Sequence, residues 1–278
     1  MTAATGLRVS WLDVFTDRPF AGNPLAVVLD ADALDSERMQ AIASELGLSE
    51  TVFVLEDAAR LRIFTPGGEL PLAGHPVVGA SLELARLGRI PSEGRTVFRT
   101  GVGETPVDLA DGVATMTQAE PRLGPKLDPV EAADALGVGP AGVVGQPQVC
   151  STGLDQGFAQ VRDRTTLARA EPDLGRIARL GSLGLVAWAD EEPGVVAQRY
   201  FVPQLGISED PATGSAAGAL GALRVFRGEA PGPLTVRQGA EIGRPSTMDV
   251  KVGGEPGRPG SVRVGGGAVL VLEAELRL

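Results

Sequence analysis

The 278-residue sequence has one cysteine, Cys150, and one histidine, His75. A single cysteine cannot form a disulfide within the chain, and it excludes a zinc site built from several cysteines. A single histidine excludes catalysis by several histidines and a metal site with several histidine ligands. The sequence also lacks a Walker A segment, a Gly-x-Gly-x-x-Gly before a helix, a Gly-x-Ser-x-Gly elbow and a His-Glu-x-x-His motif. We therefore expect no metal, nucleotide or pyridoxal cofactor.

Basic residues are outnumbered: 25 lysines and arginines face 35 aspartates and glutamates, for a formal net charge of −10. No block of lysine or arginine stands out, so nucleic acid and anionic membranes are poor candidate partners. No apolar run approaches the roughly 18 residues of a membrane-spanning helix, and no apolar leader follows a basic start. We expect a cytoplasmic protein whose partner is a small molecule, and a homodimer is one candidate assembly.

Glycine and proline are abundant, with 38 and 21 copies, and they predict many tight turns and short elements. Strands are predicted at residues 8–15, 25–29, 51–55, 61–65, 184–189, 195–202 and 268–276, with several more between 96 and 118. Helices are predicted from residue 35 or 36 to about 46, at 75–87, and at about 172–180 and 211–227. Residues 265–267 are predicted as a turn. Glu120-Pro121 and Gly124-Pro125 interrupt the pattern, which places a domain boundary near residue 119.

Two segments of the chain share one pattern. Arg62-x-Phe64-x-Pro66 returns as Arg199-x-Phe201-x-Pro203. Glu69-x-Pro71-x-x-Gly74 returns as Glu209-x-Pro211-x-x-Gly214, and the match runs on to the glycine that follows each predicted helix. Glycine and proline are common here, so chance is the alternative. The order of the motifs and the shared helix stop favour a real repeat.

The repeat predicts a strand, a turn and a helix start, built twice. Two equivalent halves facing each other would bring two helix N-termini to one cleft. Their free N–H groups and positive dipole ends would favour a bound anion, and a carboxylate substrate fits that arrangement. His75 and Ser215 fall at equivalent positions at the two helix starts, whereas Asp210 corresponds to Leu70.

Glu50 lies just before the apolar stretch Thr51-Val52-Phe53-Val54. A carboxylate at the mouth of a buried strand is partly desolvated, which raises its pKa and suits it to proton transfer near neutral pH. From position alone, an exposed loop glutamate is the simpler interpretation. The matching stretch of the second half, residues 182–188, has no acid. This position would therefore supply a single base, which suits moving a proton between two atoms on one face.

Three further residues are candidates for the site. A helix N-terminus would lower the pKa of His75, and the place of His75 in the repeat favours a functional role over a packed or capping histidine. Asp210 precedes a proline at a helix entry and Ser215 lies in a first turn, so helix capping is an alternative role for both. Cys150 is most simply a buried small hydrophobic residue.

Several segments together resemble the PhzF-like family of phenazine-biosynthesis proteins. They are Asp13-Val14-Phe15-Thr16-Asp17-Arg18-Pro19-Phe20-Ala21-Gly22-Asn23-Pro24, Ser49-Glu50-Thr51-Val52-Phe53, Phe64-Thr65-Pro66, Ala73-Gly74-His75-Pro76, Glu209-Asp210-Pro211-Ala212-Thr213-Gly214-Ser215-Ala216 and Gln238-Gly239. The resemblance spans nearly the whole chain, and the Gly-His-Pro and Glu-Asp-Pro-Ala-Thr-Gly-Ser motifs are specific in this order.

The resemblance implies an α+β, diaminopimelate-epimerase-like fold with two similar domains, each a barrel-like sheet around a central helix. Residues 1–118, completed by a C-terminal strand within 263–278, would form one domain, and residues 119–262 would form the other. The ligand would bind in the cleft between them.

The resemblance also assigns roles to the candidate residues. Glu50 matches the catalytic acid/base of the family, and His75 and Asp210 match residues that assist proton transfer. The matched substrate-binding residues are Gly74, His75, Asp210, Gly214 and Ser215.

The implied activity is that of a cofactor-independent isomerase, which moves a proton between carbons of a small cyclic amino or hydroxy acid. Related epimerases use two cysteines, and the matching loops at 73–75 and 211–214 have none, so racemisation by thiols is disfavoured. The alternatives are an amino-acid epimerase or racemase, and a catalytically silent protein that binds a small carboxylate.

Overall fold

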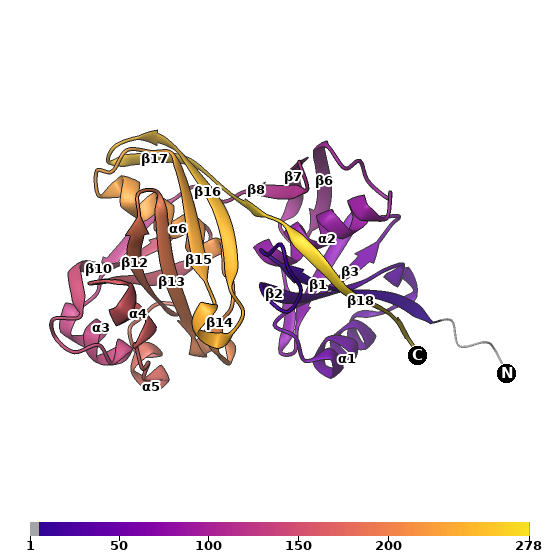
Figure 1. The fold of residues 1–278 in the computed structure, drawn as a ribbon. Helices are drawn as coiled ribbons and strands as arrows, with labels where there is room; N and C mark the ends of the chain where they lie inside the picture. Colours follow the sequence, from indigo (N-terminus) through magenta and orange to yellow (C-terminus); the bar gives the residue numbers. More distant parts are fainter. Residues whose placement is uncertain (1–5, 278) are drawn as a thin grey trace. The chain divides into compact units, whose positions relative to one another are not determined.

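A computed structural model describes residues 6–277 of the chain, which divides into two compact units. The first unit takes the described residues up to Met116 together with those from Gly265 onward. The second unit takes Thr117–Val264. Strands outnumber helices in both units, so the fold class is α+β, as predicted (Figure 1).

The first unit is built mainly from strands that are close in sequence. Its elements are β1 (Leu7–Val14), β2 (Asn23–Val28), a 3-10 turn (Ala31–Ala33), α1 (Ser36–Leu46), β3 (Thr51–Leu55), β4 (Arg60–Thr65), β5 (Gly68–Leu70), α2 (Gly74–Arg86), β6 (Gly94–Thr100), β7 (Gly103–Ala110), β8 (Val113–Thr117) and β18 (Ala268–Leu276). β2 pairs with β3 in parallel and β4 pairs with β6 in parallel. The pairs β1–β2, β3–β4, β4–β5, β6–β7 and β7–β8 are antiparallel.

The second unit has the same kinds of element in a similar order. They are β9 (Arg122–Lys126), α3 (Pro129–Leu136), β10 (Val143–Ser151), β11 (Asp155–Val161), α4 (Arg164–Ala168), α5 (Leu174–Ile177), β12 (Leu185–Glu192), β13 (Val195–Val202), a 3-10 turn (Pro203–Leu205), β14 (Ile207–Asp210), α6 (Gly214–Phe226), β15 (Pro233–Gln238), a 3-10 turn (Ala240–Ile242), β16 (Ser246–Glu255) and β17 (Arg258–Gly266). Here β11–β12 and β13–β15 are the parallel pairs.

The strand pairing confirms the repeat that the sequence predicts. The order from β1 to β7 in the first unit corresponds to that from β10 to β16 in the second, and the two parallel pairs fall at the same places. The registers also agree, since Phe64 lies opposite Thr51 and Phe201 lies opposite Leu185. In the parallel pairs, Ala26 lies opposite Thr51 and Gly157 lies opposite Leu185, so Ala26 corresponds to Gly157.

The last strand, β18, pairs antiparallel with β1, from Leu7 opposite Leu276 to Val14 opposite Ala268. Its partner could not be inferred from the sequence. In the second unit, β9 occupies the equivalent place beside β10, although β9 directly precedes that unit's other strands in sequence. The first unit thus uses a strand from the far end of the sequence, β18, at the position where the second unit uses a strand that is close in sequence, β9.

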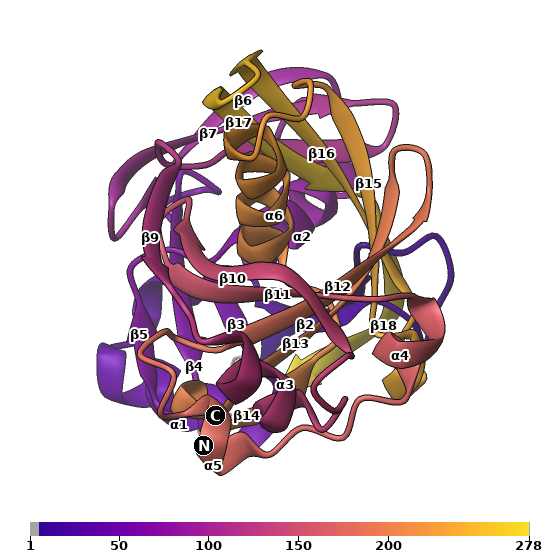
Figure 2. The same ribbon diagram turned by 90° about the vertical axis from the view of Figure 1, so that its left-hand side faces the viewer.

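Helices cover both faces of the central strands of the first unit. Met39, Ile42 and Ala43 of α1 pack against a core cluster that includes Phe53 and Phe64. α2 contacts β1, β2, β3, β7 and β18, and a Cβ added at its Gly79 would meet the side chains of Leu25, Val14 and Leu12. Because alternate residues of a strand face opposite sides, β3 is buried along its whole length. In the second unit α6 contacts β10, β11 and β16, and Figure 2 shows it lying against β10 and β11.

Local signals set the ends of α1. The Asp35 carboxylate accepts a hydrogen bond from the backbone N–H of Arg38 at 2.8 Å, and Gly47 ends the helix with a φ of 63°. These are the predicted ends. Among residues 6–277, no helix is both long and apolar enough to cross a membrane.

Three sequence predictions are wrong in detail. α6 begins at Gly214 rather than near 211, because Thr213 is extended and its backbone N–H donates to Gln238 Oε1. α5 is only Leu174–Ile177, and its start is set by the Asp173 carboxylate, which accepts a hydrogen bond from the backbone N–H of Arg176. Gly265 and Gly266 belong to β17 rather than to a turn. A Cβ at Gly265 would lie 2.8 Å from the Ala114 carbonyl oxygen, so glycine serves a close backbone approach there.

Candidate functional site

Glu50 lies in the short loop that joins α1 to β3. Its side chain is only 17% exposed. Burial raises the pKa of the Glu50 carboxyl above the ordinary value of 4.5, and a hydrogen bond with the Ser49 hydroxyl opposes that shift. The expected desolvation is therefore confirmed, and the interpretation as an exposed loop glutamate is wrong. A buried carboxyl with a raised pKa can hold a proton nearer neutral pH than an exposed one.

His75 is brought next to Glu50. It is the second residue of α2, and its side chain is 7% exposed. Its Nε2 lies 3.7 Å from Oε2 of Glu50, within ion-pair range when the imidazole is protonated but longer than a good hydrogen bond. The pair joins the loop before β3 to the start of α2, and these elements are in contact.

The starts of α2 and α6 lack side-chain caps. The N-cap of α2 is Ala73, which has no polar side chain, and the N-cap of α6 is Thr213, whose side chain makes no capping bond. The first N–H groups of a helix need partners from outside it, and they attract anions together with the helix dipole. Gly74 and Gly214, both predicted substrate-binding residues, are the first residues of these helices.

Asp210 is the last residue of β14 and is buried. Its carboxylate accepts a hydrogen bond from the Thr213 hydroxyl, which explains why that hydroxyl does not cap α6. Tyr200 lies opposite Asp210 in the neighbouring strand β13. Burial, and then the nearby charge of Asp210, raises the pKa of the Tyr200 hydroxyl far above its usual range. The phenol is therefore neutral at working pH.

Gln238, which was not predicted as a site residue, supports this loop. Its Nε2 donates to the Asp210 carbonyl oxygen at 2.6 Å, and its Oε1 accepts from the Thr213 backbone N–H at 3.1 Å. Gln198 donates to the same Oε1 at 2.7 Å. The signal was present, because Gln238-Gly239 belongs to the recognised motifs. Gly239 has a φ of 79°, and a Cβ there would lie 2.5 Å from the Pro211 carbonyl oxygen.

The repeat shows why the second unit has no counterpart of Glu50. Thr51 and Leu185 are equivalent in the two units, so Glu50, which precedes Thr51, corresponds to Gly184, which precedes Leu185. A Cβ at Gly184 would lie 2.4 Å from the Phe201 carbonyl oxygen and 2.9 Å from the Tyr200 ring. Backbone and the Tyr200 ring therefore occupy the space that a carboxylate side chain would need. Of these two equivalent positions, only the one in the first unit carries an acid.

Cys150 is fully buried in β10, as predicted. Desolvation is the main effect that raises the pKa of its thiol, to about 12. A thiol with this pKa carries almost no thiolate near neutral pH. Within residues 6–277, no group of three or more histidine, cysteine, aspartate or glutamate side chains is arranged to hold a metal ion.

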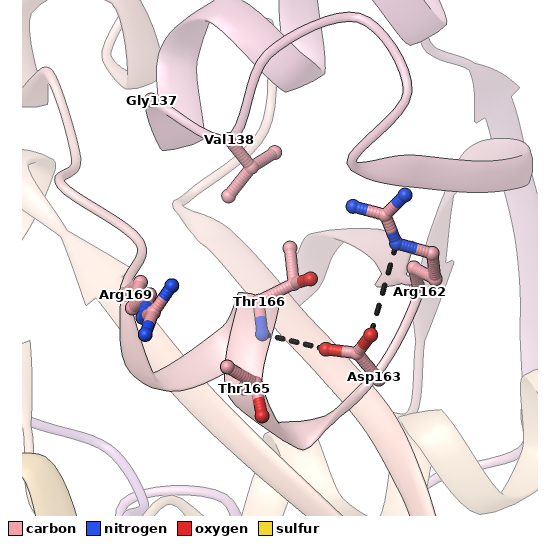
Figure 3. Close-up of a pocket in the computed structure, with 7 residues that line it drawn as sticks. All are labelled: Gly137, Val138, Arg162, Asp163, Thr165, Thr166 and Arg169. Carbon is pink, nitrogen blue, oxygen red and sulfur yellow. Dashed lines mark hydrogen bonds and ion pairs between the residues drawn. The ribbon is translucent and has the colours of Figure 1, made fainter.

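A hollow of about 330 Å³ lies in the second unit beside α4, as shown in Figure 3. Its lining residues are Gly137, Val138, Arg162, Asp163, Thr165, Thr166 and Arg169. None of the predicted site residues lines it. Asp163 is engaged by the backbone N–H of Thr166 at 2.7 Å, so this carboxylate caps α4.

Comparison with known proteins places the chain in a family. Residues 12–274 match the family model PhzC-PhzF, described as phenazine biosynthesis-like protein. This chain belongs to that family. An uncharacterized isomerase of Mesorhizobium japonicum is 36% identical, with 95% of this chain and 96% of that protein aligned. The trans-2,3-dihydro-3-hydroxyanthranilate isomerase of Pseudomonas aeruginosa is 34% identical, with 96% of this chain and 98% of that protein aligned.

The fold agrees with the PhzF family as well. The crystal structure of a Bacillus anthracis phenazine biosynthesis protein of the PhzF family superposes with a TM-score of 0.89 at 28% identity. The match covers 98% of this chain and 99% of that one. The fold is therefore the α+β, diaminopimelate-epimerase-like fold that the resemblance implied, and this member of the PhzF family is an isomerase.

The raised pKa of Glu50 predicts a pH-dependent effect on stability. Below pH 4.5 the carboxyl is neutral in the folded and unfolded chain, so wild type and Glu50→Gln should unfold at similar temperatures. As pH rises through 4.5, the unfolded chain releases the proton of Glu50 while the folded chain retains it, so the wild type loses stability relative to Glu50→Gln. This loss grows until the pH passes the raised pKa of the folded chain, and it is constant above that pH.

Thermal unfolding measured at several pH values tests this expectation. Glu45→Gln is the matched control, because Glu45 is exposed near the end of α1. A difference between wild type and Glu50→Gln that stays constant with pH would contradict the burial of an ionisable carboxyl at this position.

Proposed function

We propose that the protein moves a proton between two carbon atoms of a small cyclic amino or hydroxy acid, with Glu50 as general acid/base. The observation that carries the proposal is the buried carboxyl of Glu50, with its raised pKa, 3.7 Å from His75. A general base works best when its pKa approaches the working pH, and burial moves Glu50 in that direction.

The proton transfer balances without a co-reactant. Ionised Glu50 takes a proton from a ring carbon, and the electron pair of that C–H bond moves into the conjugated system of the substrate. The protonated Glu50 then returns the same proton to a different carbon. Substrate and product are isomers, the enzyme is regenerated, and no oxidant, reductant or cofactor is consumed. His75 would assist by stabilising the ionised form of Glu50.

The remaining predicted residues would hold the substrate. The uncapped helix starts at Gly74 and Gly214 offer backbone N–H groups to a carboxylate. Ser215, in the first turn of α6, offers a hydroxyl, and Asp210 offers a carboxylate to an amino group or hydroxyl of the substrate. The relative from Pseudomonas aeruginosa is named for trans-2,3-dihydro-3-hydroxyanthranilate, a ring with carboxyl, amino and hydroxyl groups. We propose a substrate of that class.

The structure favours this proposal over epimerisation by two opposed bases. The position in the second unit that corresponds to Glu50 is Gly184, where a side chain would collide with backbone. The thiol of Cys150 is buried and has a pKa of about 12. One acid/base group suits transfer from one carbon to another, whereas inversion of a stereocentre by two opposed bases needs a group on each face.

The direct test offers trans-2,3-dihydro-3-hydroxyanthranilate to the protein, after dialysis against EDTA, and follows the reaction by NMR. We expect turnover to an isomer of unchanged composition, at a rate that the chelator does not alter. Loss of optical activity of an amino acid, with deuterium entering its stereocentre from D₂O, would instead support an epimerase. Binding of small carboxylates without turnover of any would support a silent binding protein.

A further inference from the structure

The first turn of α6 is held by three side chains that come from outside the helix. Gln118 Nε2 donates to the Gly214 carbonyl oxygen at 2.8 Å, and Thr152 Oγ1 donates to the Ser215 carbonyl oxygen at 3.3 Å. Gln156 Nε2 donates to the Ser215 hydroxyl oxygen at 2.9 Å. The first two bonds fix the backbone of the turn. The third acts on a side chain that the proposed function places at the substrate.

Gln156 is an unusual residue for its position in β11. It is only 1% exposed, and its Oε1 is buried with no hydrogen-bond partner among residues 6–277. The strand registers make it the counterpart of Leu25 in the first unit, because Ala26 corresponds to Gly157. Leu25 is a fully buried core side chain. A buried amide with an unpaired oxygen costs stability relative to an aliphatic side chain, so its presence calls for a compensating role.

The bond from Gln156 fixes what the Ser215 hydroxyl can do. A hydroxyl has one hydrogen to donate and lone pairs that accept. Because the amide N–H points at the Ser215 oxygen, the hydroxyl hydrogen must turn away from Gln156. No described residue accepts a hydrogen bond from the Ser215 hydroxyl, and its side chain is only partly buried. The hydroxyl therefore stays available as a donor, at a helix start whose N–H groups also lack a side-chain cap.

We propose that Gln156 is a positioning residue that orients the Ser215 hydroxyl to donate to the substrate carboxylate. The inference rests on the proposed function for the carboxylate ligand, but not on Glu50 or on any proton transfer. An ordinary serine can donate or accept by rotating, and a donor fixed in advance binds an anion without that rearrangement. Gln156 thus contributes to affinity for a carboxylate rather than to the chemical step.

The decisive variant is Gln156→Glu, which keeps the shape and reverses the polarity of the bond. The ionised carboxylate of this variant accepts from the Ser215 hydroxyl and turns the hydrogen away from the ligand. Anthranilate, which has a ring carboxylate and an amino group, is the probe, and titration calorimetry at about pH 8 gives its Kd. We expect a rise in Kd of about tenfold or more, because hydrogen bonds to charged groups are among the stronger ones.

A pH series separates positioning from mere structure. Burial should raise the pKa of the carboxyl that Gln156→Glu introduces, so this group should take up a proton as the pH falls toward about 6. A protonated carboxyl can donate to Ser215 again, as the amide of Gln156 does. The ratio of the Kd of Gln156→Glu to the Kd of wild type at the same pH should therefore fall toward one as the pH falls. Gln156→Met, which frees the serine to rotate, should raise the Kd only about two- to threefold, without a pH trend.

Ser215→Ala provides the coupling control. In the Ser215→Ala background there is no hydroxyl for Gln156→Glu to turn, so the rise in Kd that this substitution causes should shrink severalfold. The rise that remains measures direct repulsion between the introduced carboxylate and the carboxylate of the ligand. An equal penalty in both backgrounds, or a Gln156→Glu protein that binds anthranilate like wild type, overturns the proposal. So does a wild type that binds neutral anthranilamide as tightly as anthranilate. None of these results depends on turnover, so failure of the isomerase mechanism would be recognised separately by Glu50→Gln.

Discussion

Glu50→Gln should lower kcat by about 10³-fold or more while leaving substrate affinity within a few-fold of wild type. Glutamine keeps the size and hydrogen-bonding reach of glutamate but cannot take up and return a proton. General acid–base catalysis contributes about 10²–10⁴-fold, and removal of a proton from carbon belongs at the upper end of that range. Affinity should survive because the helix starts and Ser215, rather than Glu50, are proposed to hold the carboxylate.

Measurement of kcat and of the substrate Kd for each variant tests this expectation. Glu45→Gln, the exposed control in α1, should retain wild-type activity. Asp210→Asn should reduce both rate and affinity, but less severely, because its hydrogen bond with Thr213 can be partly replaced. A Glu50→Gln enzyme that keeps more than about a tenth of the wild-type kcat would exclude Glu50 as the general base, and His75 or Asp210 would become the candidate.

Arg199→Met should destabilise the folded protein by about 3–5 kcal/mol, the effect of leaving one member of a buried ion pair without its partner. The Arg199 guanidinium donates to both carboxylate oxygens of Glu209, at 2.9 and 2.8 Å, and the two side chains are 8% and 10% exposed. It also donates to the carbonyl oxygens of Leu167 and Ala170, at 3.1 and 2.9 Å. Methionine fills similar volume but leaves the Glu209 carboxylate buried and unpaired.

The repeat supplies a matched control for that variant. Arg62 pairs with Glu69 as Arg199 pairs with Glu209, and each guanidinium lies about 5 Å from the phenylalanine ring two residues on. Glu69 is 43% exposed, so water can solvate it when the arginine is lost. Arg62→Met should therefore cost only about 0–1 kcal/mol. Urea unfolding of both variants decides the matter, and equal losses would show that burial does not determine the strength of these pairs.

The sequence by itself determined much of the local structure. Asp35 and Gly47 set the ends of α1, because a cap and a left-handed glycine act on the backbone beside them. The five apolar and β-branched residues of Thr51–Leu55 form a fully buried strand, as their pattern predicted. The Arg-x-Phe-x-Pro repeat predicted two similar strand, turn and helix segments, and both pair their arginine with the glutamate that follows. Such features depend on residues within about ten positions of one another, or on a sequence motif that occurs twice in the chain.

Only the tertiary structure decided which distant segments meet. β18 pairs with β1, and the sequence could not show this because hydrophobic periodicity carries no information about the partner of a strand. The 3.7 Å approach of His75 to Glu50 and the bond from Gln156 to Ser215 likewise join residues that are separate in sequence. Gln156 was missed because an isolated glutamine in a strand looks like a surface residue until packing buries it. The absence of an acid at Gly184 was visible in the sequence, but its cause, backbone and the Tyr200 ring filling the space, was visible only in the fold.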